Sequence, residues 1–136
     1  MIDEIGADNL GDAVFTKGTA DESSSHFKTF AGLFSKPSDP YTAQAWDAVM
    51  VAALALESAG GPTRDLISHV RAVANAPGVE VGPGDWAKAK KLLAAGKEIN
   101  YQGIAGAHEF DENGDVGGVY GKSVVKDGKW METLLK

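Results

Sequence analysis

One helix in the middle of the chain most constrains what this sequence can fold into. Its expected start is Ser38-Asp39-Pro40, where Asp39 can cap the first free N–H groups and Pro40 suits the first helical position. Its expected end is Gly60-Gly61, a left-handed stop. One stripe at helical spacing carries little bulk and holds Tyr41, Ala45, Ala48, Ala52 and Leu56. We therefore expect a helix that lies with this stripe flat against a sheet or another helix.

The first third of the chain predicts short strands and then a helix. Residues 2–6 are expected to be the tail of a strand, followed by a turn at 6–9, and residues 13–16 a second short strand. Residues 17–20 read as a connector. A helix should begin among the acids and serines of 21–25 and end at Pro37. Its inner face should carry Phe27, Phe30 and Phe34.

Two further helices are expected after the central one. The first runs from Thr63 to about Asn75, and its inward residues are Leu66, Ile67, Val70 and Val73 or Ala74. The second follows Asp85 and stops at Gly96, with an apolar side made of Trp86, Ala89, Leu92 and Leu93.

From Ile99 the pattern changes to short β-prone runs, and residues 119–126 and 129–135 predict a hairpin around Asp127-Gly128. The order of strand, four helices and strands indicates an α/β protein without a neat βαβ alternation. Such an order suits a piece of a larger α/β protein.

Composition excludes several classes of function. The 136 residues fit at most one domain, and the net charge of −6 argues against a nucleic-acid partner. Cysteine is absent, which removes disulfides and thiol chemistry. No stretch is long and apolar enough to span a membrane, and the residues after Met1 do not form a signal peptide.

No residue constellation predicts catalysis, a metal site or a cofactor. The acidic run 111–115 fails the EF-hand pattern, because the required glycine and glutamate positions hold Val116 and Lys122. A polar turn is the expected structure there. The three histidines, His26, His69 and His108, lie too far apart in sequence for a zinc motif, so surface or capping roles are expected. The glycines of 103–121 lack a phosphate-loop spacing and are expected to allow positive φ at turns.

Two blocks of sequence resemble a known family. The run 40–60, with Pro40-Tyr41-Thr42-Ala43-Gln44-Ala45-Trp46-Asp47-Ala48-Val49 at its start, is similar to the signature helix of branched-chain amino-acid (Leu/Ile/Val) binding proteins. The run 99–116, with Ile99-Asn100-Tyr101-Gln102-Gly103 and Phe110-Asp111-Glu112-Asn113-Gly114, resembles the C-terminal part of the same family. These proteins are extracytoplasmic receptors of ABC importers with the type I periplasmic-binding fold. The resemblance runs from about Ile5 to the C-terminus and implies a partial fold of this type.

The resemblance also implies where function lies. Asp8 matches the position at which an acid meets the α-amino group of a bound amino acid, although an ordinary turn-capping role is an equal alternative. Thr16, Lys17 and Gly18 would form one connector between two lobes, and Gln102 and Gly103 would lie near another. Residues 1–16 and about 106–136 would belong to one lobe, and about 20–104 would supply the helices of the other.

We therefore expect a fragment of a solute-binding protein that captures an amino acid or similar small metabolite for an ABC permease, with no enzymatic activity. The parent would be periplasmic or extracytoplasmic. Apolar helix faces without a cover predict self-association or a missing N-terminal part. The alternative is a free-standing interaction or dimerisation module that derives from this fold and has lost ligand binding.

Overall fold

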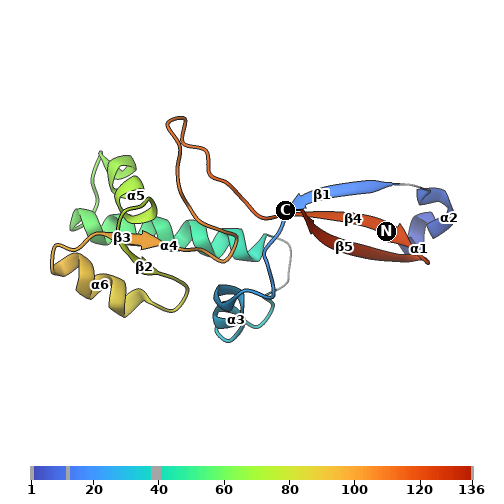
Figure 1. Ribbon diagram of the computed structural model, residues 1–136, viewed down its shortest axis with the longest axis horizontal. Helices are drawn as coiled ribbons and strands as arrows, with labels where there is room; N and C mark the ends of the chain where they lie inside the picture. Colours follow the sequence, from blue (N-terminus) through green and yellow to red (C-terminus); the bar gives the residue numbers. More distant parts are fainter. Residues whose placement is uncertain (1, 12, 38–40, 136) are drawn as a thin grey trace.

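The computed structural model describes residues 2–11, 13–37 and 41–135. The chain forms two parts that lie end to end along the long axis of the molecule (Figure 1). We call them the sheet arm, made of α1, α2, β1, β4 and β5, and the helical body, made of α3–α6, β2 and β3. The predicted mixed α/β class is confirmed.

The sheet arm contains a three-stranded antiparallel sheet. Its strands are β1 (Val14–Gly18), β4 (Tyr120–Lys126) and β5 (Lys129–Leu135), in the order β1-β4-β5. The predicted hairpin is confirmed: Asp127 and Gly128 both have positive φ, 51° and 72°, which matches the twist of adjacent antiparallel strands. Residues far apart in the chain are thereby joined, because Val14 pairs with Val124 and Gly18 pairs with Tyr120.

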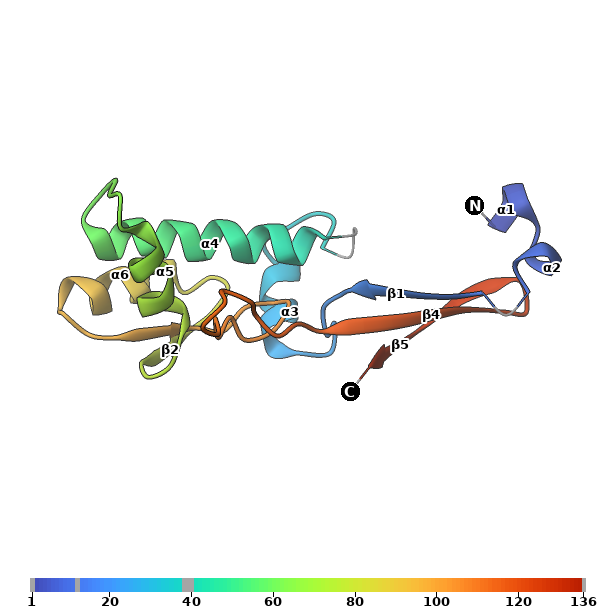
Figure 2. The same ribbon diagram turned by 90° about the horizontal axis from the view of Figure 1, so that it is seen from above.

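The N-terminal residues fold into helix, so the expected strand at 2–6 and turn at 6–9 are wrong. Two short helices, α1 (Ile2–Ile5) and α2 (Ala7–Leu10), lie at the far end of the sheet arm (Figure 2). Gly6 separates them at φ 83°, and the side-chain amide of Asn9 donates to the carbonyl of Ile5 at 2.7 Å. A strand needs a partner, whereas a helical turn satisfies its hydrogen bonds within the segment.

The helical body begins with α3 (Ser25–Ala31), whose N-terminus is capped by Ser24 through a 3.1 Å hydrogen bond from the amide of Phe27. Phe27 and Phe30 are buried as predicted. Phe34 lies beyond the end of the helix, yet its ring stacks on Phe30 with centroids 5.5 Å apart. Trp46 completes this aromatic cluster, with its ring 5.3 Å from that of Phe30.

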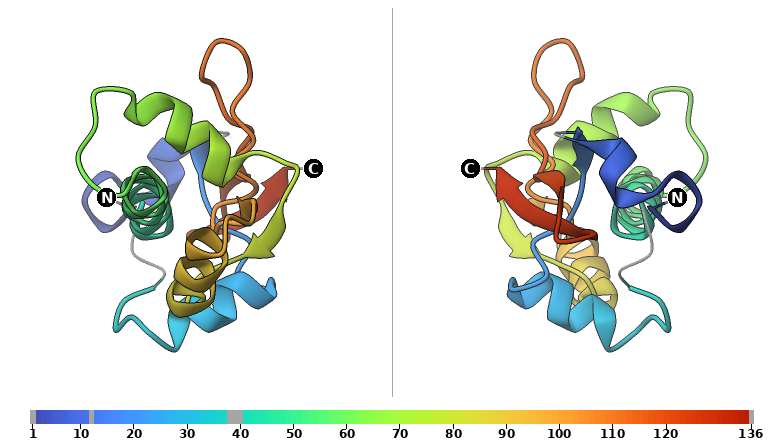
Figure 3. Two further views of the ribbon diagram at one scale, coloured as in Figure 1. Left: turned by 90° about the vertical axis from the view of Figure 1, so that its left-hand side faces the viewer. Right: turned by 90° about the vertical axis from the view of Figure 1, so that its right-hand side faces the viewer.

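The long central helix, α4 (Thr42–Ala59), runs along the length of the body and is seen nearly end-on in Figure 3. Its predicted stop is confirmed, because Gly60 adopts φ 73° and donates to Glu57, while Gly61 donates to Leu56. The expected caps at Asp39 and Pro40 lie outside the described residues. Tyr41, at φ 61°, precedes the first helical turn.

The face of α4 that the sequence analysis expected to pack is instead the outer one. Tyr41, Ala45, Ala48, Ala52 and Leu56 are all exposed. The buried side carries Ala43, Asp47, Val51, Leu54 and Ala55. Alanine is abundant on both sides of this helix, so spacing alone did not separate the faces; the larger Val51 and Leu54 mark the packed one.

The rest of the body is a βαβ unit beside a further helix, which the sequence analysis did not expect. Strands β2 (Val79–Val81) and β3 (Ile99–Tyr101) pair in parallel, and α6 (Trp86–Ala94) connects them. β2 has only three residues, too few to show an alternation. Helix α5 (Leu66–Ala74) packs against α4. It begins three residues later than predicted.

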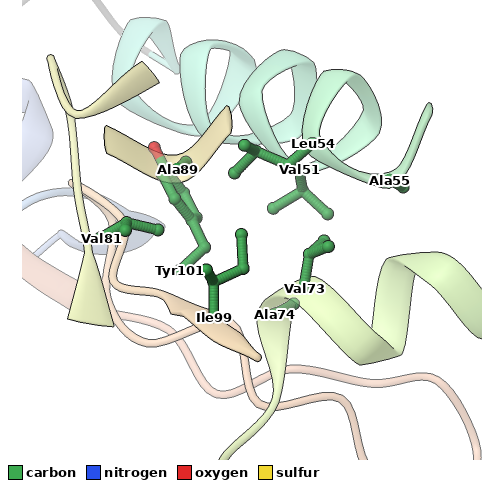
Figure 4. Packing of buried hydrophobic residues seen from close by; sticks show 9 residues of the cluster. All are labelled: Val51, Leu54, Ala55, Val73, Ala74, Val81, Ala89, Ile99 and Tyr101. Carbon is green, nitrogen blue, oxygen red and sulfur yellow. The ribbon is translucent and has the colours of Figure 1, made fainter. Parts of the chain in front are cut away.

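One apolar core joins these elements (Figure 4). Its buried members are Val51, Leu54, Ala55, Val73, Ala74, Val81, Ala89, Ile99 and Tyr101. Two residues expected on inward faces are instead largely outside it, since Ile67 is 61% exposed and Trp86 is 37% exposed. Among the described helices, none has the length and apolar character that a membrane span requires.

Candidate functional site

Two segments cross side by side between the sheet arm and the helical body (Figure 2). One leaves β1 through Thr19, and the other enters β4 through Val119. The amide of Thr19 donates to the carbonyl of Val119 at 2.9 Å, and the amide of Val119 donates to Ala105 at 3.3 Å. From the body, the side-chain amide of Gln44 donates to the carbonyl of Thr19 at 3.2 Å. We call this junction the crossing.

A cavity of about 480 Å³ lies beside the crossing. The exposed side of α4 and the segment 116–120 form its main walls, and most of its lining is apolar. The lining residues are Gly18, Thr19, Gln44, Ala48, Val51, Ala52, Val70, Ala105, His108, Phe110, Val116, Gly117, Gly118, Val119 and Tyr120. A volume of this size is typical of small-molecule sites. The outer face of α4 therefore borders a space that a small ligand can fill.

A buried carboxylate ties the body to the segment that leads to the crossing. Asp47, on the inner face of α4, has no solvent exposure. Its Oδ1 accepts from the Tyr101 hydroxyl at 2.8 Å and from the Ile104 amide at 3.0 Å, and its Oδ2 accepts from the Ala105 amide at 2.8 Å. Hydrogen bonds to an ionised group are stronger than neutral ones, and they compensate the cost of burying the charge.

Two further groups face this carboxylate. Nε2 of His108 lies 3.9 Å from Oδ2 of Asp47, and Nδ1 of the same ring lies 3.0 Å from the carbonyl oxygen of Gly106. The pKa of the Tyr101 hydroxyl is raised far above its ordinary value, first by burial and then by the negative charge of Asp47. Tyr101 therefore stays protonated and keeps donating to Asp47.

The sequence patterns do not predict Asp47 or His108 as site residues. A signal for Asp47 existed, because it is the only charged residue among the alanines and aliphatic residues of α4 before Glu57. No signal existed for His108, which was expected at the surface or in a cap; it is 15% exposed at its side chain and packs beside Tyr101. Its neighbours come from parts of the chain that only the fold brings together.

The predicted connector Thr16, Lys17 and Gly18 forms the end of β1 that meets the crossing. Thr16 pairs with Lys122 and Lys17 with Gly121 in the sheet. The ammonium of Lys17 lies 2.8 Å from the carboxylate of Glu132, and this hydrogen bond is the main cause that lowers the pKa of Glu132.

The predicted residues Gln102 and Gly103 lie on the body side of the crossing, directly after β3. Gln102 donates to the carbonyl of Val81 at 2.8 Å, and Gly103 donates to Gly106 at 3.1 Å. Gly103 is buried and has negative or extended backbone geometry, so its lack of a side chain serves close packing and not a positive φ. Whether these residues act as hinges stays a prediction.

Asp8, the predicted ligand-binding acid, lies in α2. That helix is at the opposite end of β1 from Gly18 (Figure 1), so the structure does not bring the backbone of Asp8 next to the crossing or the cavity. Its role in ligand binding stays a prediction.

The acidic run 111–115 forms the polar turn that the sequence predicted. Asp111 accepts through Oδ1 from the amides of Asn113 and Asp115, both at 2.9 Å, and Gly114 has φ 90°. These bonds to backbone amides, that of Asp115 first, lower the pKa of Asp111. In the described ranges, no group of three acidic, histidine or cysteine side chains is placed to hold a metal ion.

Comparison with known proteins adds a family and a relative. Residues 7–120 match the family described as "Receptor family ligand binding region". A segment of 71 residues is 38% identical to the "Chemotactic signal transduction system substrate-binding protein BasB" of Halobacterium salinarum (strain ATCC 29341 / DSM 671 / R1). This match covers 52% of the present chain but only 17% of that relative's length. No solved structure matches the chain.

The match and the fold agree. The helices, the short strands and the crossing form a mixed α/β arrangement consistent with a partial type I periplasmic-binding fold. Both the family and the relative are of the receptor or substrate-binding kind, which is a ligand-binding and not a catalytic description. Because the family match spans most of the chain, the protein belongs to the receptor ligand-binding-region family.

Proposed function

We propose that the chain is part of an extracytoplasmic solute-binding protein that captures an amino acid or similar small metabolite and delivers it to an ABC permease. The observation that carries this proposal is the crossing. Two adjacent segments, joined by the hydrogen bond between Thr19 and Val119, connect the sheet arm and the helical body in a chain of the receptor ligand-binding family. Such a junction allows two parts to close on a ligand without unfolding either one.

In this proposal the sheet arm and the helical body contribute to two lobes. Residues 1–16 and about 106–136 belong to one lobe, and about 20–104 belong to the other. The connectors are Thr16, Lys17 and Gly18 on one side and Gln102 and Gly103 on the other. A ligand that contacts both lobes favours the closed arrangement by the difference between its affinities for the two states.

The cavity beside the crossing supports a small ligand with an apolar portion. Its walls are mainly alanine, valine and phenylalanine, and no lysine or arginine is among the described residues that line it. A free amino acid carries an ammonium and a carboxylate, which need charged or hydrogen-bonding partners when they leave water. Asp8 is the proposed partner of an ammonium, but it lies at the opposite end of β1 from this cavity, so the cavity and Asp8 are alternative sites and not two halves of one. In either case the carboxylate is assigned to groups contributed by the rest of the parent protein.

Calorimetry with leucine, isoleucine and valine tests the proposal. The chain should be measured alone and joined to the preceding region of the solute-binding parent. We expect heat of binding from the joined form and little or none from the chain alone, because half a cleft cannot desolvate its ligand. In the joined form, Asp8→Asn should weaken binding at least tenfold, whereas Asp65→Asn, at an exposed position before α5, should not. Absence of heat from every form would refute ligand capture.

A second candidate is an interaction module without a small ligand. It is favoured by the exposed apolar residues on the sheet arm, where Val14, Tyr120 and Met131 are each slightly more than half exposed. A sheet with uncovered apolar residues is a common feature of surfaces that meet another chain. Sedimentation equilibrium separates the two candidates. A stable dimer that gives no heat of ligand binding in calorimetry supports the interaction module, and a monomer excludes a dimerisation module. Neither candidate requires catalysis, a cofactor or nucleic acid.

A further inference from the structure

We propose that Asp47 is a positioning residue that fixes the turn at 102–105 rigidly to α4, so that the arm and the body do not bend relative to each other at Gln102-Gly103. The inference rests on the proposed function, because it concerns the connectors that the two lobes would use. It removes Gln102 and Gly103 from the flexible part of one connector and gives the buried carboxylate a specific task.

The carboxylate of Asp47 bonds to one short stretch of chain with both of its oxygens. Both oxygens of Asp47 are engaged, and the three donors come from one short stretch of chain: the Tyr101 hydroxyl and the amides of Ile104 and Ala105. Two successive backbone amides can point at the two oxygens of one carboxylate only in a narrow range of backbone conformations. The carboxylate therefore selects one shape for this turn and holds it against α4.

Gly103 has no space around it for a side chain. A Cβ on this residue would lie 2.6 Å from Oδ2 of Asp47 and would also collide with the ring of His108. The neighbouring Gln102 is held twice, since its backbone amide donates to Val81 at 2.8 Å and its side chain donates to Asn100 at 2.7 Å. A glycine packed this closely cannot sweep through different φ and ψ values without moving the groups around it.

Residues 116–118 contrast with the tightly packed Gly103. All three are exposed. A Cβ added to Gly117 would meet nothing within 4 Å, and one added to Gly118 would approach only the ring of Tyr120, at 3.5 Å. Two adjacent glycines in open space have the backbone freedom that Gly103 lacks. Val119, which follows them, donates to the carbonyl of Ala105 at 3.3 Å, so the fixed turn also holds the chain where it enters β4.

Amide hydrogen exchange on the chain without ligand tests the fixed turn. In the wild type, the amides of Ile104 and Ala105 should exchange at least tenfold more slowly than those of Gly117 and Gly118. In Asp47→Asn, the side chain keeps its shape but loses its charge and one acceptor. We expect the exchange rates of the Ile104 and Ala105 amides to increase by a factor at least ten times larger than the factor for the Val73 and Ile99 amides in the same variant.

Leu54→Ala is the matched control, because it opens a space in the same core without touching the carboxylate. This variant should increase the exchange rates of the Ile104 and Val73 amides by similar factors. If Asp47→Asn produced this same uniform pattern, the residue would be an ordinary member of the core. If the wild-type amides of Ile104 and Ala105 exchanged as fast as those of Gly117 and Gly118, the turn would not be fixed.

The hold of the turn on the arm has a separate readout. The chain has no cysteine, so Lys97→Cys in the body and Lys126→Cys in the arm provide two unique sites for spin labels. Asp47→Asn should broaden the measured distribution of distances between the two labels, whereas Gly117→Ala combined with Gly118→Ala should leave it unchanged. An unchanged distribution in Asp47→Asn would contradict a turn that holds the arm to the body.

Each of these measurements is made without ligand. Evidence against the fixed turn would therefore not bear on ligand capture. Absence of binding heat in calorimetry would likewise not bear on the fixed turn.

Discussion

The backbone amide of Thr19 donates a 2.9 Å hydrogen bond to the carbonyl of Val119, joining the strand that ends near residue 18 to the one that begins at residue 120. This bond lies just beyond the pairing of Gly18 with Tyr120, and it joins the two segments that pass between the sheet arm and the helical body. Any relative movement of the two parts must either bend both segments together or break the bond. The variants below test the packing and the charges on either side of this junction.

Truncation of two leucines of α4 distinguishes its two faces. Leu54 is fully buried and Leu56 is 38% exposed. Leu54→Ala should lower the free energy of unfolding by about 3 kcal/mol, because it removes apolar contacts and leaves a cavity. Leu56→Ala should lower it by less than about 1 kcal/mol. Urea denaturation measures both, and a larger loss for Leu56→Ala would mean that the outer face is packed in solution.

Addition of one methyl group distinguishes two glycines near the crossing. Gly103→Ala should destabilise the chain by about 2 kcal/mol, because the new Cβ has no room beside Asp47 and His108. Gly117→Ala adds the same methyl group in open space and should change the free energy of unfolding by less than about 1 kcal/mol. Thermal unfolding of the two variants in parallel is the measurement. Equal effects would contradict the tight packing at Gly103.

The ion pair of the sheet arm predicts a pH effect of known sign. The hydrogen bond from Lys17 lowers the pKa of Glu132 below its ordinary value of 4.5, and a hydrogen bond from Thr19 contributes further. A lowered carboxyl pKa stabilises the fold above the ordinary value, and this contribution is lost as the pH falls through the folded-state pKa. Because the pair is more than a third exposed, it contributes at most about 0.5 kcal/mol.

A carbon NMR titration of Glu132 measures this shift directly. Lys17→Met should move the midpoint up toward 4.5, whereas Lys122→Met, on the other face of the sheet, should leave it in place. A midpoint that does not respond to Lys17→Met would show that the pair does not form in solution.

The buried tyrosine predicts an effect at alkaline pH. Burial and the charge of Asp47 raise the pKa of Tyr101 above its ordinary value of 10.0. Its contribution to stability is therefore fully present below pH 10.0 and is lost as the pH rises above that value, where the unfolded chain releases the proton and the folded chain does not. Tyr101→Phe should be less stable than wild type by about 1 kcal/mol at neutral pH, because Asp47 loses one donor.

Above the ordinary pKa the gap between Tyr101→Phe and wild type should narrow, because the variant lacks the proton that the unfolded wild type releases. Urea denaturation at several pH values measures this. Tyr120→Phe, at a half-exposed position, is the control for loss of a hydroxyl and should change the neutral-pH stability by less than about 0.5 kcal/mol. A gap that stays constant with pH would contradict the buried, hydrogen-bonded hydroxyl.

The sequence by itself determined the elements whose signals are local. The stop of α4 at Gly60, the hairpin turn at Asp127-Gly128 and the turn at Asp111 depend on residues within a few positions of each other. The two blocks of family resemblance were likewise visible in the sequence, and the match over residues 7–120 confirms the receptor ligand-binding family.

The tertiary structure alone decided which surfaces meet. α4 has small residues on every side, so only its contacts with α5 and β3 show that Leu54 is inside and Ala52 outside. Strand β2 exists because β3 lies beside it. The segment at 2–5 is helical, and none of the strands in the described residues pairs with it. Asp47 and Tyr101 are 54 residues apart, and a hydrogen bond over that separation has no local signal. Local chemistry specifies turns and helix ends, whereas burial depends on what the rest of the chain places opposite each face.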